Sequence, residues 1–390
     1  MEMLDAISSY IHIPFCEHIC YYCDFNKVFY EGQPVDEYLE KLDLEMKLWL
    51  EKYPQQQTPT IYIGGGTPTS LNDAQLRSLL TSVTKYFDVT TTKEFTVEAN
   101  PGDLTENKLH IMQEFGVNRL SMGVQTFNDR LLKKIGRKHT VKDVDDTLNF
   151  LAKNHFDNVS IDLIYALPGQ TQQDFDETLK QALSYDLPHY SMYSLILENK
   201  TMFMNWVRKG RLELPSQEEE AGMFALAMDV MRQKGYEQYE VSNFAKPGFQ
   251  SQHNLVYWNN EYYFGFGAGA SGYVDKVRYK NHGPIQHYLN PLRNQQLPIL
   301  SEETLDQKAR MEEEMFLGLR KAQGVSIAHF NEKFGVDFHQ IYGSVVGNYV
   351  SKGLLNQTDN GYIQLTKKGL FLGNEVFEGR RRIRTIIRNA

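Results

Sequence analysis

The cysteines limit what this chain can be more than any other feature. There are three, Cys16, Cys20 and Cys23, and they lie within one eight-residue window in the spacing C-x3-C-x2-C. An odd number of closely spaced thiols does not form a disulfide framework, so a metal centre is the better interpretation. A structural zinc ion would need a fourth ligand, for which His12 and His18 are the candidates. Three thiolates also suit a [4Fe-4S] cluster whose remaining iron is open to a non-protein ligand.

Length, composition and charge describe an ordinary folded chain. Its 390 residues are 41% hydrophobic and 23% charged, which excludes a disordered or collagenous protein and predicts two or three compact units. With a formal net charge of −8, the chain lacks the excess of basic residues that a protein needs to bind duplex nucleic acid, so we expect no nucleic-acid partner. The sequence has no apolar run of about 18 residues and no signal peptide, so we expect a cytoplasmic protein.

Strand and helix patterns alternate through the first half of the chain. Short apolar runs predict six strands, at 11–13, 60–66, 94–99, 119–124, 159–167 and 189–197. Amphipathic patterns predict helices at 36–50, from Asn72 onward, and at 105–115, 128–152, 171–184 and 218–233. This alternation is typical of parallel β/α units, so we expect an α/β fold with a partial (β/α)6 barrel over residues 5–210.

The residues around the cysteines, YIHIPFCEHICYYCDF, resemble the radical S-adenosylmethionine (SAM) superfamily and, within it, the HemN/HemW family. The resemblance implies that Cys16, Cys20 and Cys23 bind a [4Fe-4S] cluster. It also implies that the open iron chelates the amino and carboxylate groups of SAM. This superfamily uses a partial barrel of six β/α units as its core, in agreement with the alternation of strands and helices.

Polar residues stand at the ends of the predicted strands, where a β/α barrel places its reactive groups. The glycines after the second strand would let a ligand approach the backbone closely, although a tight turn explains them equally well. Glu98, Gln125 and Asp162 end the next three strands, and singly each is as readily a helix cap or a surface ion pair. By resemblance to the family, the residues of the SAM pocket are Tyr10, Tyr22, Gly65, Gly66, Thr67, Glu98, Gln125, Arg137 and Asp162.

A second motif lies far from the cysteines. Residues 253–258 read His-Asn-Leu-Val-Tyr-Trp and match the HNxxYW motif of the haem-chaperone branch of the family. A neutral imidazole is a common axial ligand of haem iron, and adjacent aromatic rings offer flat apolar area to a porphyrin. The motif therefore predicts that His253 binds haem iron. Without the motif, a structural histidine beside core aromatic residues would be the simpler interpretation.

From about residue 211 the alternation of strands and helices ends. We expect an α+β extension over 211–298 that carries HNxxYW, and a basic tail over 379–390. Residues 299–378 resemble the winged-helix-like C-terminal domain of the family, and Asn360-Gly361 predicts a hairpin within it. The arginines of the tail favour a solvated segment, with contact to an anionic membrane surface as the alternative.

Gly267, Gly269 and Gly272 satisfy the dinucleotide-binding pattern G-x-G-x-x-G. They follow an aromatic stretch instead of a strand that opens a βαβ unit, so the structural context of that pattern is missing. We expect a glycine-rich turn that packs closely against the aromatic residues.

Two functions from different classes compete, with an unrelated radical enzyme as the least favoured third. One is a haem chaperone, with haem as cargo and haem-accepting proteins, such as respiratory enzymes at the membrane, as partners. The other is oxygen-independent coproporphyrinogen III oxidase, whose motif continues to a fourth cysteine where this chain has Phe25, and whose N-terminal extension has no counterpart in the 15 residues before Cys16. We therefore expect the chaperone, as a monomer able to dimerise, cytoplasmic or peripheral at the inner face of the membrane.

Overall fold

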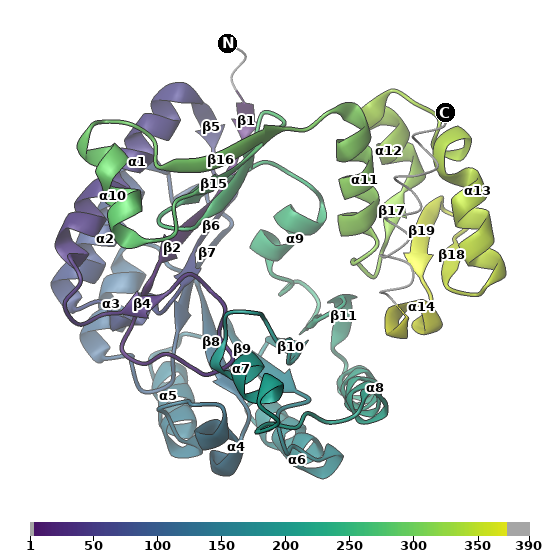
Figure 1. The fold of residues 1–390 in the computed structure, drawn as a ribbon, viewed down its shortest axis with the longest axis horizontal. Helices are drawn as coiled ribbons and strands as arrows, with labels where there is room; N and C mark the ends of the chain where they lie inside the picture. Colours follow the sequence, from purple (N-terminus) through teal and green to yellow (C-terminus); the bar gives the residue numbers. More distant parts are fainter. Residues whose placement is uncertain (1–3, 373–390) are drawn as a thin grey trace. The chain divides into compact units, whose positions relative to one another are not determined.

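The computed structural model describes residues 4–372, and these residues form two compact units (Figure 1). The larger unit contains the chain up to Glu237, Ser242–His253 and Tyr262–Thr304. The smaller contains Gln238–Val241, Asn254–Glu261 and the chain from Leu305. The basic tail expected at 379–390 lies outside the described residues. Within residues 4–372, no helix is long and apolar enough to cross a membrane.

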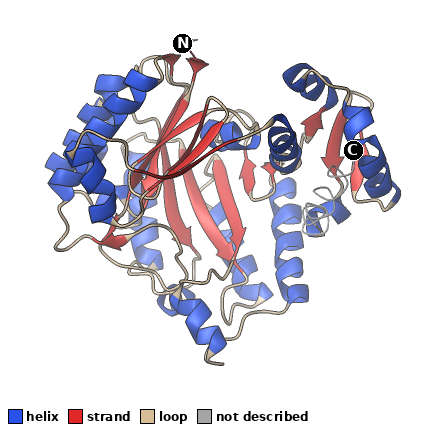
Figure 2. Cartoon of the chain, turned by 45° about the horizontal axis from the view of Figure 1, so that its top comes forward, coloured by secondary structure: helices blue, strands red, loops and turns tan. Residues whose placement is uncertain are grey.

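A sheet of parallel strands forms the centre of the larger unit, with helices along its outer face (Figures 1 and 2). Six parallel strands follow the order β10-β9-β8-β7-β6-β2. These strands are β2 (Ser8–Ile13), β6 (Thr60–Gly65), β7 (Glu94–Ala99), β8 (Arg119–Gln125), β9 (Val159–Tyr165) and β10 (His189–Ser194). The helices that connect them are α1 (Val35–Lys52), α2 (Asp73–Tyr86), α3 (Glu106–Glu114), α4 (Asp129–Lys134), α5 (Val141–Lys153) and α6 (Gln172–Leu183). The predicted fold of six β/α units is confirmed.

The inner face of these strands is polar. In β7, the buried apolar residues Phe95 and Val97 alternate with polar residues, as expected for a strand with two different faces. Polar side chains of neighbouring strands bond to one another, as between Tyr62 and Glu98. The inner face of the sheet therefore carries titratable groups whose pKa values burial can shift.

The single helix predicted over 128–152 is wrong: two helices, α4 and α5, occupy this range. Gly136, at φ +75°, takes a left-handed conformation after α4, and Thr140 caps the start of α5. The interval between the two helices carries Arg137, so the break places this side chain in the region of the cysteines.

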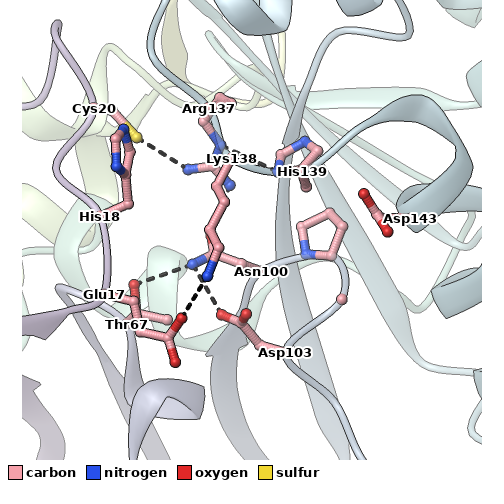
Figure 3. A pocket seen from close by; sticks show the side chains of 12 residues that line it. Glu17, His18, Cys20, Thr67, Asn100, Asp103, Arg137, Lys138, His139 and Asp143 are labelled. Atoms are coloured by element: carbon pink, nitrogen blue, oxygen red, sulfur yellow. Dashed lines mark hydrogen bonds and ion pairs between the residues drawn. The ribbon is translucent and has the colours of Figure 1, made fainter.

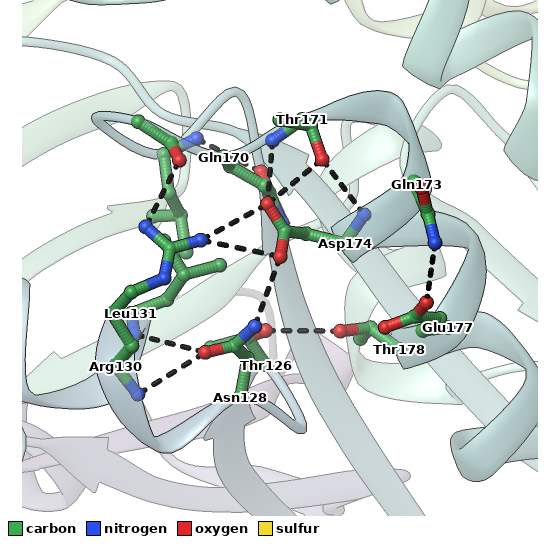
Figure 4. Close-up of polar contacts among 12 residues, drawn as sticks. Thr126, Asn128, Arg130, Leu131, Gln170, Thr171, Gln173, Asp174, Glu177 and Thr178 are labelled. Atoms are coloured by element: carbon green, nitrogen blue, oxygen red, sulfur yellow. Dashed lines mark hydrogen bonds and ion pairs between the residues drawn. The ribbon is translucent and has the colours of Figure 1, made fainter.

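Side-chain bonds hold the turn that leads into α4 (Figure 4). Asn128 caps α4 and donates to Asp174 at 3.0 Å, and Arg130 forms an ion pair with the same carboxylate at 3.1 Å. Thr126 and Thr178 share a buried hydrogen bond of 3.0 Å. Together these bonds fix the end of β8 against α6.

Later parts of the chain extend the same sheet at both edges, which the sequence did not predict. β12 (Asn243–Ala245) pairs antiparallel with β10, and β13 (Tyr263–Phe266) pairs parallel with β2. Beyond β13 the sheet continues antiparallel with β14 (Ser271–Val274), β15 (Val277–Asn281) and β16 (Ile299–Thr304). The remaining elements of the larger unit are β1 (Leu4–Ala6), β3 (Phe15–Cys16), β4 (Val28–Phe29), β5 (Gln55–Gln57), η1 (Pro68–Ser70), α7 (Met202–Arg208), α8 (Gln217–Gln233) and α10 (Ile285–Arg293). Two elements, β11 (Glu237–Glu240) and α9 (Gln252–Trp258), begin in the larger unit and belong for most of their length to the smaller one.

The G-x-G-x-x-G segment is a packed turn, as expected. Gly267 has φ +98°, and a Cβ atom there would lie 2.5 Å from the carbonyl oxygen of His12. The Gly267 amide donates to the buried carboxylate of Glu45 at 2.8 Å, and the Ala268 amide donates to the Tyr38 hydroxyl at 2.9 Å. Because these two amides already donate to side chains of the protein, they are not free to bind the phosphates of a dinucleotide.

Glu45 makes the stability of the larger unit depend on pH. Burial raises the pKa of Glu45 to about 7, although hydrogen bonds from Tyr288, Gly267 and Asn281 act in the opposite direction. The folded state therefore binds a proton more tightly than the unfolded chain, and stability falls as pH rises from about 4.5 to about 7. We expect the free energy of unfolding of wild type, relative to Glu45→Gln, to fall by about 3 kcal/mol over this window. Urea denaturation of both proteins at pH 5, 6, 7 and 8 measures this difference, and parallel pH profiles would contradict it.

The smaller unit is a helical module with a β-wing, as predicted. Its helices pack around buried apolar residues such as Phe330 and Phe338. The expected hairpin at Asn360-Gly361 joins β18 to β19, with Gly361 at φ +80°. The elements are α11 (Gln307–Gly318), β17 (Val325–Ser326), α12 (Ile327–Phe334), α13 (Phe338–Ser351), β18 (Leu355–Gln357), β19 (Tyr362–Leu365) and α14 (Lys367–Phe371).

Candidate functional site

The loop that carries the cysteines follows β2 and is held at several points. Cys16 ends the short strand β3, which pairs with β4, and the Tyr30 amide donates to the Cys16 carbonyl at 2.9 Å. Midway along the loop, the backbone carbonyl of Asn26 bonds to His12 Nε2 at 2.7 Å. The Tyr21 ring packs against the Trp206 ring, with their centroids 5.0 Å apart. The loop is therefore a defined structure whose three thiols stand in fixed positions.

The three cysteines are free thiols that influence one another electrostatically. Burial raises the pKa of Cys16, the hydrogen bond from Thr67 lowers it and the neighbouring thiols Cys23 and Cys20 raise it, which together give a pKa of about 11. Burial also raises the pKa of Cys23. Metal binding must therefore displace protons from these sulfur atoms. Three soft donors gathered in one loop fit an iron–sulfur cluster, in which each thiolate binds its own iron.

His12, one of the two candidate fourth ligands of a zinc ion at this loop, already uses its ring nitrogens within the protein. Both ring nitrogens of His12 are used, since Nδ1 bonds to the Tyr10 hydroxyl at 2.8 Å and Nε2 to the Asn26 carbonyl. Among residues 4–372, no three His, Cys, Asp or Glu side chains converge on a position for a single metal ion.

A chain of polar contacts links two of the cysteines. Thr67 Oγ1 lies 3.6 Å from Cys16 Sγ and accepts a hydrogen bond from Asn100 at 3.1 Å. The Arg137 guanidinium donates to Asn100 at 2.7 Å and to Cys20 Sγ at 3.5 Å. Sequence reasoning found Thr67 and Arg137 but missed Asn100, whose position just beyond β7 was the available signal.

Beside this chain of contacts lies a polar cavity of about 220 Å³, lined in part by Cys20, Thr67, Asn100 and Arg137 (Figure 3). The Arg137 side chain is oriented by the Gly123 carbonyl, which accepts at 2.6 Å, and by His139 Nδ1, which accepts at 3.4 Å. His139 in turn bonds through Nε2 to the Val124 carbonyl at 3.2 Å. The cavity lining consists of Glu17, His18, Cys20, Thr67, Asn100, Pro101, Gly102, Asp103, Arg137, Lys138, His139 and Asp143.

The glycine run after β6 packs against the protein's own atoms. A Cβ atom on Gly64 would lie 2.7 Å from Glu98, and one on Gly65, at φ +113°, would lie 2.4 Å from the His12 ring. A Cβ atom on Gly66 would lie 2.7 Å from the backbone of Pro14. Tight packing thus accounts for all three glycines, and contact of this turn with a cofactor stays a prediction.

Two half-buried acids of the predicted pocket have raised pKa values. Burial raises the pKa of Glu98 to about 7 and that of Asp162 to about 6, and Asp162 adds to the shift of Glu98. Glu98 accepts from the Tyr62 hydroxyl at 2.7 Å and from the Gly65 amide at 2.9 Å. The statement that Asp162 ends its strand is wrong, because β9 continues to Tyr165 and Asp162 lies in its middle.

The other predicted pocket residues are Gln125, Tyr22 and Tyr10. Gln125 is the last residue of β8, buried, with φ +69° beside a register shift. Tyr22 lies beside Arg137 and Cys20, and burial raises its pKa. Burial likewise raises the pKa of Tyr10, next to Glu98. Tyr10 and Asp162 thus lie in the middle of β2 and β9, whereas Glu98 and Gln125 lie at or next to the carboxyl ends of β7 and β8. Of the nine predicted residues, Thr67 and Arg137 line the cavity.

His253 lies at the opposite end of these strands. Its Nδ1 bonds to the hydroxyl of Thr60, the first residue of β6, at 2.7 Å, and its ring stacks on Tyr62 with centroids 5.2 Å apart. The side chain is 1% exposed, and burial lowers its pKa to about 3. Strand β6, about 16 Å long at 3.3 Å per residue, runs from Thr60 beside His253 to the glycine turn near the cysteine loop. In this conformation the imidazole is neutral and closed to solvent.

Glu94, which sequence reasoning missed, holds the start of α9. Its carboxylate accepts from the amides of Gln252 at 2.9 Å and His253 at 3.0 Å, and Arg119 lies 3.9 Å from it. Farther along the motif, in the smaller unit, the Trp258 ring lies 4.7 Å from the Arg320 guanidinium.

Comparison with known proteins places the chain in a family. Residues 10–182 match the model of the radical SAM superfamily, and residues 305–372 match that of the HemN C-terminal domain. The chain is 49% identical over 371 residues to the haem chaperone HemW of Lactococcus lactis, covering 95% of this chain and 96% of that one. It is 50% identical over 371 residues to HemW of Bacillus subtilis, covering 95% and 98%.

The chain belongs to the HemW family.

Membership of this radical SAM family implies a [4Fe-4S] cluster and SAM as cofactors. Among solved structures, this chain resembles coproporphyrinogen III oxidase (HemN) from Escherichia coli, with a TM-score of 0.83, covering 96% of this chain and 89% of that one. At 23% identity this likeness concerns the fold alone.

Proposed function

We propose that this protein is a haem chaperone that binds haem and passes it to haem-accepting proteins. The observation that carries the proposal is its identity of about one half, over nearly the whole length, to two proteins named haem chaperone HemW. Respiratory enzymes at the membrane are the acceptor class that we propose. The protein would then work as a monomer able to dimerise, in the cytoplasm or peripherally at the inner face of the membrane.

His253 is our proposed ligand of haem iron. A neutral imidazole has the lone pair that iron needs, and the lowered pKa of His253 keeps this side chain neutral at physiological pH. A ring that is 1% exposed cannot meet a porphyrin, so haem binding requires His253 to leave its place beside Thr60 and Tyr62. Titration with haem of wild type and His253→Ala, argued in the Discussion, tests the proposal.

Cys16, Cys20 and Cys23 are our proposed ligands of the cluster. When bound, the cluster supplies an open iron at which SAM can be chelated. Arg137 then keeps a hydrogen-bond donor beside Cys20, and the half-buried acids Glu98 and Asp162 favour a cationic ligand. The residues that we propose for SAM are Tyr10, Tyr22, Gly65, Gly66, Thr67, Glu98, Gln125, Arg137 and Asp162.

Oxygen-independent coproporphyrinogen III oxidase is the second candidate, favoured by the fold that the chain shares with HemN. Against it stands Phe25, which occupies the position of the oxidase's fourth cysteine and is 64% exposed. Turnover of coproporphyrinogen with SAM and a reductant distinguishes the two functions.

We expect SAM to bind more tightly as pH rises through the pKa of Glu98. This acid has a pKa of about 7 in the folded protein, and SAM, as a cation, favours its ionised form. The dissociation constant of SAM should fall by about tenfold between pH 6 and pH 8, since the competent fraction rises by about that factor. Glu98→Gln should bind SAM weakly with little pH dependence.

Equilibrium dialysis of SAM against reconstituted protein without a reductant measures this effect. Glu45→Gln is the matched control, because Glu45 likewise has a pKa of about 7 but bonds to the turn at Gly267. If the SAM dissociation constant of Glu98→Gln changes with pH as much as that of wild type, Glu98 is not the group whose ionisation favours SAM binding.

A further inference from the structure

Tyr62 is the one described side chain for which both a ring contact to His253 and a hydrogen bond to Glu98 are present. It is the third residue of β6 and belongs to neither sequence motif. Its ring stacks on the imidazole at an interplanar angle of 27°, and its hydroxyl donates to Glu98 Oε1 at 2.7 Å. One rigid side chain therefore contacts groups from both proposed sites.

The contact continues to the turn after β6 without a gap. The second oxygen of Glu98 accepts from the Gly65 amide at 2.9 Å. A Cβ atom on Gly64 would lie 2.7 Å from both Glu98 and Tyr62, so the two side chains have no room to part on that side. In such a close-packed cluster, a displacement of one side chain moves its neighbours, because the packed groups have no free space in which to deform gradually.

We propose that Tyr62 couples the two sites, so that SAM bound at Glu98 weakens the binding of haem at His253. The inference rests on the proposed function, since it needs both ligands. It adds a direction of control: the protein with SAM bound would release haem more readily than the protein without it.

The direction follows from what each ligand requires. Haem can reach His253 only after the imidazole leaves the Tyr62 ring, whereas SAM, a cation, favours the ionised form of Glu98. A hydrogen bond from a hydroxyl to a carboxylate is shorter and stronger than one to a neutral acid, so SAM holds Tyr62 in place against His253. By linkage, haem must weaken SAM binding by the same factor.

The test compares haem affinity with and without saturating SAM, in reconstituted protein, anaerobically and without a reductant so that SAM stays intact. Tyr62→Phe keeps the stacked ring and removes only the hydroxyl bond. Tyr190→Phe is the matched control: Tyr190 is buried in β10 and its hydroxyl donates to the Ala182 carbonyl at 3.0 Å, away from both sites.

We expect SAM to raise the haem dissociation constant at least about fivefold in wild type and Tyr190→Phe, and less than about twofold in Tyr62→Phe. The reciprocal measurement, SAM affinity with and without haem in wild type, should give the same factor and needs no variant to fold. Equal factors in wild type and Tyr62→Phe, no SAM effect in wild type, or tighter haem binding with SAM would each overturn the coupling. A haem dissociation constant that is the same in wild type and His253→Ala would instead overturn the proposed function, in which His253 is the ligand of haem iron.

Discussion

Cys20→Ser protein, reconstituted with iron and sulfide under anaerobic conditions, should retain less than about one iron per chain, against about four in wild type. Serine offers a hard oxygen in place of a soft thiolate, which iron–sulfur clusters do not tolerate well as a ligand. The fold should survive, because the serine hydroxyl can still accept the hydrogen bond that Arg137 donates to Cys20 Sγ. Iron and sulfide analysis with the visible absorption of the cluster measures the loss.

His253→Ala is the control for this experiment and should keep its iron. His253 bonds to Thr60 at the start of β6, at the far end of the strand from the cysteine loop. Equal loss of iron in both variants would mean that the division into two sites is wrong. Thermal unfolding of each apo protein shows whether either substitution damages the fold itself.

Haem binding to cluster-reconstituted protein should be saturable near one equivalent, and His253→Ala should weaken it at least about tenfold. The expected loss is that of the axial iron ligand, which contributes more than the apolar contacts of the porphyrin can replace. Anaerobic titration followed by absorption measures both the stoichiometry and the affinity.

His189→Ala is the matched control for the haem titration. His189 is also 1% exposed, and its Nδ1 bonds to the Ser160 hydroxyl at 2.7 Å, the same arrangement as His253 with Thr60. It belongs to β10 and not to the HNxxYW segment, so we expect its variant to bind haem like wild type. If wild type and His253→Ala bind haem equally, or neither binds it, turnover of coproporphyrinogen with SAM becomes the assay to run.

Local patterns predicted the elements whose residues decide their own structure. Asn72 was expected to open a helix, and it caps α2 in a capping box with Gln75. The six short runs of apolar and β-branched residues became the six parallel strands, and the polar residues that alternate with them, as in β7, face the interior of the sheet. The hairpin at Asn360-Gly361 followed from the left-handed conformation that glycine adopts.

Patterns failed where distant segments supply the partner. Strands β13 to β16 extend the sheet beside β2, and no local signal in residues 263–304 indicates which edge they join. For the sheet edge, the decisive contacts join residues far apart in the chain. The break between α4 and α5 is different, because Gly136 and Thr140 are local signals of a helix end and a helix start that the amphipathic pattern over 128–152 hid.

The sequence by itself determined the family and the chemistry that the cysteine loop offers, because a donor set and its spacing are properties of adjacent residues. Only the tertiary structure decided how those groups are used: that Asn100 and Arg137 join Cys16 to Cys20, that burial shifts the acids Glu98 and Asp162, and that His253 stacks on Tyr62 out of reach of solvent. Burial and side-chain neighbours arise from packing between strands distant in sequence, and these set both the protonation of a group and its access to a ligand.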